Sequence, residues 1–316
     1  MKVDYQHIAK DKLKEIGYEE NFTILEKISK RSTDIALGVD STELREQGAV
    51  DQGIIFGYAC NETKELMPLL IMLTNQIFKE MDMLKKDKYA HIFDPDGKCQ
   101  VSVVYEKGKP KKVQIVVVST QTKSLIKREL YEDIIINEVL TKFLDDKAIQ
   151  EADILINLTG EFVIGGPYAD SGLTGRKIIV DTYGGGAFSG KDVRKVDRSA
   201  AYYARYVAKA IVEANLADRC EVCVAYSIGV ADPVSLSINT FETGKLSDVE
   251  LLEVVKKLFD FTPSNIRKEL EFEKVKFKSL AAYGHIGRED LPVRWENVED
   301  KAQELRVEYE KAKGTA

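Results

Sequence analysis

The chain has 316 residues, of which 46 are Lys or Arg and 52 are Asp or Glu, giving a formal net charge of −6. This acidic balance argues against a nucleic-acid-binding protein held by diffuse positive charge. With 44% hydrophobic and 31% charged residues, the composition is typical of a globular protein with a sizeable core.

Nothing in the sequence predicts a membrane span or a leader segment. The longest apolar stretch lies around Leu66 to Leu73, is interrupted by Pro68, and falls short of the ~18 residues that a membrane helix needs. The opening Met-Lys-Val-Asp-Tyr-Gln-His lacks the apolar segment of a secretory signal and the Arg- and Ser-rich character of a transit peptide. We expect a cytoplasmic protein that binds neither nucleic acid nor membrane.

The first half of the chain predicts helices around one hairpin. Residues 2–16 carry apolar side chains at helical spacing, and Gly17 ends this helix. The stretch 29–53 is polar and punctuated by glycine, which is typical of a long loop. The elements expected next are a helix over 66–87, a hairpin of the strands 100–106 and 112–119, and an amphipathic helix over 122–145.

The second half begins with the apolar segments 153–157 and 162–164, after which the chain becomes glycine-rich. The β-branched run 177–182 predicts a buried strand, and Asp197 is predicted to cap a long helix that ends near Asn215. Two strands and two helices are expected after it, at 221–230, 234–241, 247–260 and near the C-terminus. Two strands, a helix and returning strands thus follow one another in 100–164 and again in 221–280. This order indicates an internal repeat of helices over mostly antiparallel sheets, an α+β fold.

The cysteines and histidines do not predict a metal cluster. Cys220 and Cys223 form a C-x-x-C pair, but they lie in a predicted strand, where residues three apart face opposite sides. We therefore expect both to pack within the strand. His7, His91 and His285 are widely separated, so neither a zinc cluster nor a serine-type triad is visible.

Eight of the 21 glycines lie between Gly165 and Gly190. We expect the chemistry of the protein in this segment. Such density is typical of main chain that approaches a ligand closely or adopts positive φ. Cations alternate with carboxylates here, namely Arg176, Lys177, Lys191, Arg194, Lys195 and Arg198 with Asp170, Asp181, Asp192 and Asp197. This mixture suits a polyphosphate with Mg²⁺, and the alternative is a solvated, charge-balanced loop.

Residues 185–192 nearly fit the P-loop pattern G-x-x-x-x-G-K-[ST]. The last position is Asp192 instead of the Ser or Thr that binds Mg²⁺, and the predicted helix does not follow Lys191 directly. A different phosphate site is favoured, and a P-loop-like nucleotide hydrolase is the alternative.

Several motifs together resemble the S-adenosylmethionine synthetase family over essentially the whole chain. The most specific are Gly-Gly-Gly-Ala-Phe-Ser-Gly-Lys-Asp at 184–192 and the block Asp-Ser-Gly-Leu-Thr-Gly-Arg-Lys-Ile-Ile-Val-Asp-Thr-Tyr-Gly-Gly at 170–185. Shorter matches lie at 48–53, 56–59, 96–101, 195–202 and 282–285. The resemblance implies that ATP, L-methionine and water give S-adenosylmethionine, phosphate and diphosphate, with Mg²⁺ (two ions expected) and K⁺ as cofactors.

The resemblance also implies three related β/α units around a pseudo-threefold axis. The expected domains are 1–46, a remnant of the first unit with the family's mobile loop; 47–164, the central unit; and 165–316, the C-terminal unit with the phosphate loop. It further implies a homodimer, with a tetramer as the alternative, and active sites at the subunit interface.

The resemblance assigns roles to individual residues. Those expected to bind ATP are Asp96, Gly97, Lys98, Phe162, Asp170, Arg176, Lys177, Ala187 and Lys191. Those expected near methionine are Asp51, Asp170, Lys195 and Ile228. The catalytic cations are Lys98, Arg176, Lys177, Lys191 and Lys195, and Asp197 is the expected Mg²⁺ ligand. The structural alternatives are a helix cap for Asp197 and core packing for Phe162 and Ile228.

The chain departs from the family pattern at several positions. It begins within the family's first unit, without the Gly-His-Pro-Asp-Lys motif. Arg31 stands where a glutamine is expected, Glu161 replaces an arginine, and the connection from Tyr183 to Ala187 is short. We therefore expect the 316-residue chain to be impaired as an enzyme, and a non-catalytic relative that still dimerises is the alternative.

Overall fold

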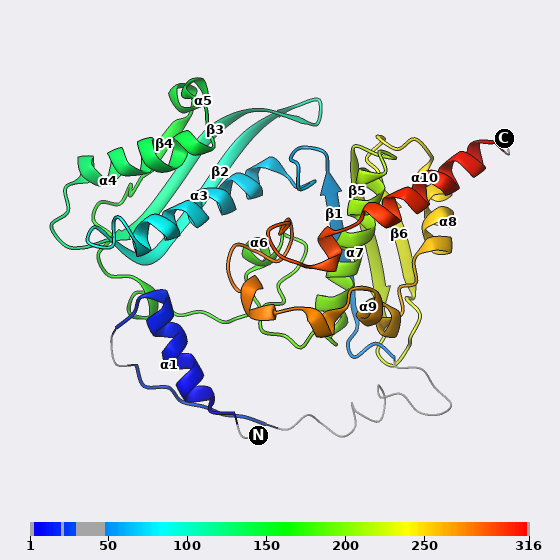
Figure 1. Ribbon diagram of the computed structural model, residues 1–316, viewed down its shortest axis with the longest axis horizontal. Helices are drawn as coiled ribbons and strands as arrows, with labels where there is room; N and C mark the ends of the chain where they lie inside the picture. Colours follow the sequence, from blue (N-terminus) through cyan, green and yellow to red (C-terminus); the bar gives the residue numbers. More distant parts are fainter. Residues whose placement is uncertain (1–2, 20–21, 30–47, 315–316) are drawn as a thin grey trace. The chain divides into compact units, whose positions relative to one another are not determined.

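A computed structural model describes residues 3–19, 22–29 and 48–314, shown in Figure 1. It divides into two compact units, of which unit 1 comprises 1–31 and 73–172 and unit 2 comprises 32–72 and 173–316. Each unit contains one three-stranded sheet together with helices, so the predicted α+β fold is confirmed. Arg31 lies outside the described residues.

The sheet of unit 1 has the order β2-β3-β4. Strands β2 (Phe93–Glu106) and β3 (Lys109–Thr122) form an antiparallel hairpin around a tight turn at 107–108, and β4 (Asp153–Ile156) pairs in parallel with β3. The predicted hairpin is confirmed, and both of its strands are longer than expected.

The helices of unit 1 confirm two predictions and correct a third. Helices α1 (Tyr5–Ile16) and α3 (Leu69–Lys86) lie where they were expected. Helix α4 (Arg128–Ile134) begins later than predicted, because Thr122 still belongs to β3 and Leu125 has a φ of 65°. The chain then continues through a π-helical turn (Ile135–Val139), a 3₁₀ turn (Leu140–Lys142) and α5 (Asp146–Glu151).

The sheet of unit 2 is antiparallel and has the order β1-β5-β6. Strands β5 (Arg219–Tyr226) and β6 (Ser235–Asn239) were predicted, whereas β1 (Gly53–Cys60) was not. Along β5 buried and half-buried residues alternate, so Cys220 is buried while Cys223 faces the other side, as expected.

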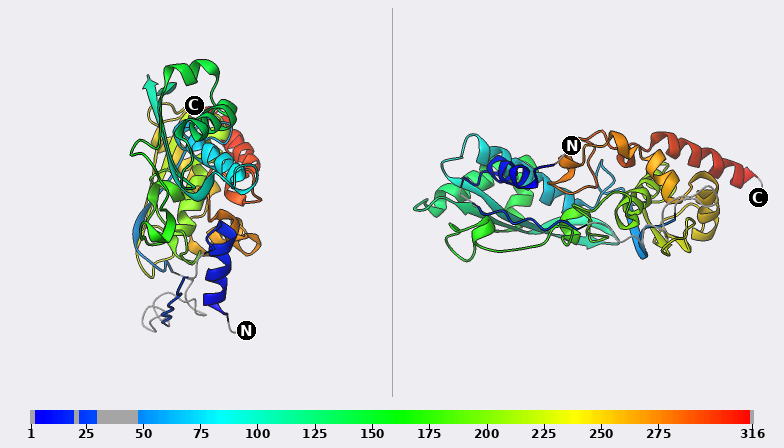
Figure 2. Two further views of the ribbon diagram at one scale, coloured as in Figure 1. Left: turned by 90° about the vertical axis from the view of Figure 1, so that its left-hand side faces the viewer. Right: turned by 90° about the horizontal axis from the view of Figure 1, so that it is seen from below.

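The helices of unit 2 cover one face of this sheet (Figure 2, right). They are α7 (Val196–Glu213), α8 (Asp248–Leu258), α9 (Pro263–Glu269) and α10 (Glu299–Gly314). Helix α7 packs on β1 and β5 and is almost entirely buried. Its buried cations Arg205 and Lys209 each lie 3.0 Å from Glu296 Oε2, which anchors the helix. Short 3₁₀ turns of unit 2 occur at Phe272–Lys274, Phe277–Leu280 and Arg294–Glu296, and unit 1 has one at Gly166–Tyr168.

None of the helices that the structure describes is long and apolar enough to cross a lipid bilayer.

The predicted strand over 177–182 is wrong, because residues Ile178–Asp181 form the short helix α6. The β-branched run Ile178, Ile179 and Val180 stays exposed, and no strand of the described chain pairs with it. The predicted returning strands are also wrong for 162–164 and for the second copy of the repeat, since the described residues after β6 contain only helices and turns.

The structure also excludes two of the alternatives, the P-loop-like hydrolase and the helix cap at Asp197. A P-loop hydrolase needs a parallel sheet with a strand leading into the phosphate loop, whereas unit 2 has an antiparallel sheet and a helix at that position. Asp197 is not the N-cap of α7, because Lys195 occupies that position and Asp197 lies in the first turn.

Candidate functional site

The glycine-rich loop of unit 2 is fixed by one buried carboxylate. Asp181, at the end of α6, is 4% exposed. Its Oδ2 accepts hydrogen bonds from the backbone N–H groups of Phe188 (2.6 Å) and Ser189 (2.8 Å), and its Oδ1 accepts one from Ser189 Oγ (2.7 Å). Phe188 is fully buried. The alternative of a merely solvated loop is therefore wrong for this segment.

Two glycines bring the segment before α6 against the end of this loop. Gly175 (φ 76°) approaches the loop so closely that a Cβ would lie 2.9 Å from Ser189 O. Gly190 (φ 78°) likewise leaves no room, since its Cβ would lie 2.8 Å from Thr174 Cγ2. Only glycine suits both the backbone angle and the close approach. The backbone just before Arg176 and Lys177 therefore lies against the backbone just before Lys191.

The four predicted cations of unit 2 lie near this junction and near the start of α7. Lys191 pairs with Asp197, and Lys195 Nζ lies 3.1 Å from Asp51 Oδ2. Arg176 and Lys177 are exposed, and within the described part of the chain neither forms an ion pair. Of these four cations, two therefore form no ion pair with a described residue and two face carboxylates. Ala187, in the same loop, is half-buried.

The carboxylate of Asp197 has one oxygen in use and one without a partner. Its Oδ2 faces Lys191, whereas its Oδ1 is buried and accepts no hydrogen bond. Among the described residues no group of three or more His, Cys, Asp or Glu could hold a metal ion by itself. Mg²⁺ is often held by one or two carboxylates together with phosphate oxygens, so the unpartnered Oδ1 would suit an Mg²⁺ shared with a phosphate ligand once the carboxylate turned toward it.

The two residues predicted near methionine lie on adjacent segments of unit 2. The backbones of the two loops pair, with Ala49 N donating to Val230 O (2.9 Å) and Gly229 N donating to Ala49 O (2.9 Å). This pairing places the loop of Asp51 beside the loop of Ile228. Ile228 is 50% exposed, so the alternative of core packing is wrong for it.

The predicted ATP residues of unit 1 gather around Asp96. Its Oδ1 accepts from the N–H of Gly97 and its Oδ2 from the N–H of Gly166, both at 2.7 Å. The carboxylate thus ties β2 to the first glycines after Phe162. Phe162 is half-buried, and its carbonyl accepts from Thr122 N (2.9 Å).

Two further predicted residues of unit 1 are exposed. Lys98 forms no ion pair within the residues that the structure covers. The carboxylate of Asp170 accepts from the neighbouring Ser171 N at 2.8 Å. Both side chains therefore remain available to a ligand.

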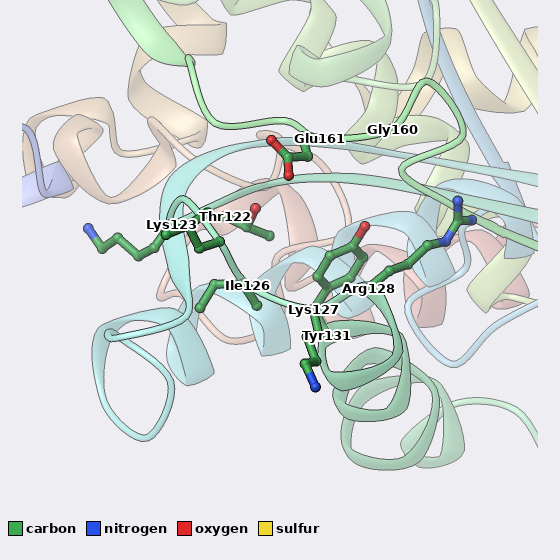
Figure 3. Close-up of a pocket in the computed structure, with 9 residues that line it drawn as sticks. Thr122, Lys123, Ile126, Lys127, Arg128, Tyr131, Gly160 and Glu161 are labelled. Carbon is green, nitrogen blue, oxygen red and sulfur yellow. The ribbon is translucent and has the colours of Figure 1, made fainter.

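A cavity of about 310 Å³ in unit 1 reaches Glu161, and none of the predicted site residues lines it. Figure 3 shows the carboxylate of Glu161 and the hydroxyls of Thr122 and Tyr131 facing this space. It is lined by Thr122, Lys123, Leu125, Ile126, Lys127, Arg128, Tyr131, Gly160 and Glu161.

Sequence reasoning assigned no supporting role to the side chains that hold the glycine-rich loop. His285 Nε2 lies 2.7 Å from Ser189 Oγ, and His285 Nδ1 lies 2.7 Å from the hydroxyl of Tyr202. Arg198 donates from Nε to that hydroxyl (3.0 Å) and from Nη1 to the carbonyl of Lys191 (2.5 Å). The signals for these residues were the family-like motifs at 195–202, which contains Arg198 and Tyr202, and at 282–285, which contains His285.

Unit 1 holds a second missed residue, Lys85. It is 6% exposed, and its Nζ donates to the carbonyls of Pro95 (3.2 Å) and Asp96 (3.1 Å). Burial lowers the pKa of Lys85 to about 8, although nearby aspartates oppose the shift. A lone lysine on a helix carries no sequence pattern that reveals this role.

Two protein-family models match the chain. The central domain of S-adenosylmethionine synthetase matches residues 46–162. The C-terminal domain of S-adenosylmethionine synthetase matches residues 164–297. The first match covers Asp96 and Lys98, and the second covers the whole glycine-rich loop and α7.

The environment of His285 predicts a loss of stability in acid. Burial, together with Arg198 and Arg288, lowers its pKa to about 4, and Asp181 opposes the shift. Between pH 6.5 and 4 the unfolded chain binds more protons at this site, so the free energy of unfolding falls as the pH falls. Urea titrations at pH 7 and pH 4.5 should show the wild type losing about 2 kcal/mol more than a His285→Asn variant. Equal losses of unfolding free energy in the wild type and in His285→Asn would contradict the lowered pKa of His285.

Proposed function

We propose, from the premise that the chain belongs to the S-adenosylmethionine synthetase family, that it binds ATP and L-methionine and joins them into S-adenosylmethionine. The methionine sulfur forms a bond to C5′ of the ribose, and the C5′–O bond breaks with both electrons leaving on the triphosphate. Water then divides the triphosphate into phosphate and diphosphate.

This chemistry asks for fixed positive charge and for no general base. A neutral thioether has no proton to lose, so the barrier lies in the negative charge that grows on the departing triphosphate. We assign that stabilisation to Arg176, Lys177, Lys191 and Lys195 in unit 2 and to Lys98 in unit 1. Asp197 would hold Mg²⁺, which when bound neutralises phosphate oxygens. We assign no site for K⁺ among the described residues.

The observation that carries the proposal is the loop held by Asp181, which ends at Lys191 and adjoins the segment that leads to Arg176. In the structure Lys191 faces Asp197 and Lys195 faces Asp51. Binding of a triphosphate would exchange these carboxylates for phosphate oxygens and leave the net charge of the site nearly balanced.

The remaining proposed roles concern the binding of ATP and of methionine. In unit 1, Asp96, Gly97 and Asp170 would contact ATP, and Phe162 would stack on adenine. In unit 2, the loop containing Ala187 would approach the phosphates, while Asp51 and Ile228 would lie near methionine. Asp170 is also a candidate for the methionine amine.

A non-catalytic relative of the family is the second candidate, favoured by Glu161. Its exposed carboxylate precedes Phe162, where the resemblance leads us to expect an arginine. An anion in place of a cation beside a triphosphate is unfavourable by charge alone.

Binding and turnover separate the two candidates. We expect calorimetry to show binding of inorganic tripolyphosphate with Mg²⁺ to the 316-residue chain. Lys191→Met should weaken it about tenfold or more, because a charge-assisted contact is lost. The matched variant Lys257→Met, on an exposed face of α8, should bind like the wild type. Labelled methionine entering S-adenosylmethionine would establish the enzyme, whereas tripolyphosphate binding without turnover would favour the non-catalytic relative. No binding would contradict the proposed site.

We also propose that the chain forms a homodimer through the face of the β1-β5-β6 sheet that no described helix covers. Ile54 is 66% exposed and Phe56 is 37% exposed on this face. Exposed apolar side chains on an uncovered sheet are typical of a subunit interface.

An arginine on this face should weaken the dimer. Sedimentation velocity should give a dimer for the wild type and a larger share of monomer for Ile54→Arg, because a charge would be buried without a partner. Val249→Arg places the same charge at a residue that is 72% exposed on α8 and should leave the dimer intact. A monomeric wild type, or equal behaviour of the two variants, would refute this interface.

A further inference from the structure

We propose that His285 is a positioning residue that holds the Lys191 loop for a triphosphate, as the central link of a directed hydrogen-bond chain from Arg198 to Asp181. The inference deepens the proposed function and rests on it for the identity of the ligand. The chain of hydrogen bonds itself stands on the geometry of unit 2 alone.

The hydrogens in this chain can be assigned in only one order. A guanidinium has no acceptor, so Arg198 Nε donates to the Tyr202 hydroxyl oxygen. The Tyr202 hydrogen then has His285 Nδ1 as its acceptor at 2.7 Å. At the other end the Asp181 carboxylate only accepts, so Ser189 Oγ donates to it at 2.7 Å. Ser189 Oγ must therefore accept from His285 Nε2, also at 2.7 Å. The geometry assigns a neutral imidazole with its hydrogen on Nε2.

The imidazole ring is held so that it cannot adopt another orientation. His285 is 2% exposed, and its ring lies perpendicular to Phe188 and nearly parallel to Tyr202. Tyr202 stacks in turn on Trp295, with ring centroids 4.1 Å apart. The backbone is fixed as well, since His285 N donates to Asp181 O (2.8 Å) and Trp295 Nε1 donates to His285 O (2.9 Å).

This chain of hydrogen bonds holds the loop on both sides of its lysine. Ser189, two residues before Lys191, is held through Asp181 and His285. Lys191 itself is held through its carbonyl, which accepts from Arg198 Nη1 at 2.5 Å. The ammonium group of Lys191 is thereby left free to turn from Asp197 to a phosphate, while its backbone stays in place.

The direction of the hydrogens excludes a serine nucleophile. In a serine triad the histidine accepts the hydroxyl proton, whereas here Ser189 gives its proton to Asp181 and accepts one from His285. His285 therefore acts through the loop and not on the substrate. The charged groups that face it are Asp181, Arg198 and Arg288. With two cations and one carboxylate around it, a protonated ring is unfavourable.

The test uses the full chain and a matched pair of tyrosine variants. Within the described residues, Tyr202→Phe removes the only donor to His285 Nδ1. Tyr226→Phe removes another buried tyrosine hydroxyl, one that donates to Phe261 O (2.6 Å) on a different part of unit 2. Tyr202→Phe loses two buried hydrogen bonds, one from Arg198 Nε and one to His285 Nδ1, whereas Tyr226→Phe loses one. Urea titrations of both variants therefore measure any difference in the free energy of unfolding beside the two readouts.

Two measurements are made on each protein at pH 7.5. Nitrogen-15 NMR of labelled histidine reports the protonated ring nitrogen, and a His285→Gln variant assigns the His285 signal among the three histidines. Calorimetry with inorganic tripolyphosphate and Mg²⁺ reports the affinity of the loop. We expect the Nε2–H form in the wild type and in Tyr226→Phe. In Tyr202→Phe we expect some of the Nδ1–H form, which cannot donate from Nε2 to Ser189 Oγ. The loss of that hydrogen bond implies about fivefold weaker binding of tripolyphosphate.

Each outcome decides the inference. An Nδ1–H or doubly protonated ring in the wild type would overturn it. Equal tripolyphosphate affinities for the two tyrosine variants would overturn the positioning role and leave the proposed function standing. If the wild type binds no tripolyphosphate, the proposed function fails, and amide hydrogen exchange of Phe188 and Ser189 decides the positioning role. Faster exchange in Tyr202→Phe alone would then support it, and equal exchange in both variants would refute it.

Discussion

The structure of the glycine-rich loop depends on the buried carboxylate of Asp181. A buried carboxylate is costly unless its oxygens accept hydrogen bonds, and here three donors from Phe188 and Ser189 meet that need. The same three bonds give the loop a single path, although glycine-rich main chain otherwise has wide conformational freedom. Each cation that follows the loop in sequence takes its position from this path.

The cations near the loop are balanced by carboxylates, which keeps a strongly positive cluster from repelling itself in the absence of ligand. Lys191 faces Asp197 and Lys195 faces Asp51, and all four side chains are partly exposed. In the proposed function, a triphosphate with its metal ion would replace both partners at once, since phosphate oxygens suit the lysines and the metal ion suits Asp197. Charge balance of this kind explains why glycine, cations and carboxylates alternate in one short stretch of sequence.

Local patterns predicted much of the fold, and distant contacts escaped prediction. Apolar spacing located α1, α3 and α7, and alternation located β2, β3 and β5, because these signals act between near neighbours in sequence. The β-branched run in α6 misled us, since strand propensity needs a partner strand and none in the described chain pairs with it. The hydrogen bonds that link Asp181 to His285 could not be foreseen, because the contacts of His285 join residues 83 and 96 positions apart in the sequence.

The most direct test is a crystal structure of the chain with Mg²⁺ and imidotriphosphate, a triphosphate that resists hydrolysis. The account predicts phosphate oxygens on Lys191 and on Arg176 or Lys177, Asp197 turned toward Mg²⁺, and the hydrogen bonds from Phe188 and Ser189 to Asp181 unchanged. An anion bound away from this loop, or a loop that leaves Asp181 when the anion binds, would contradict it.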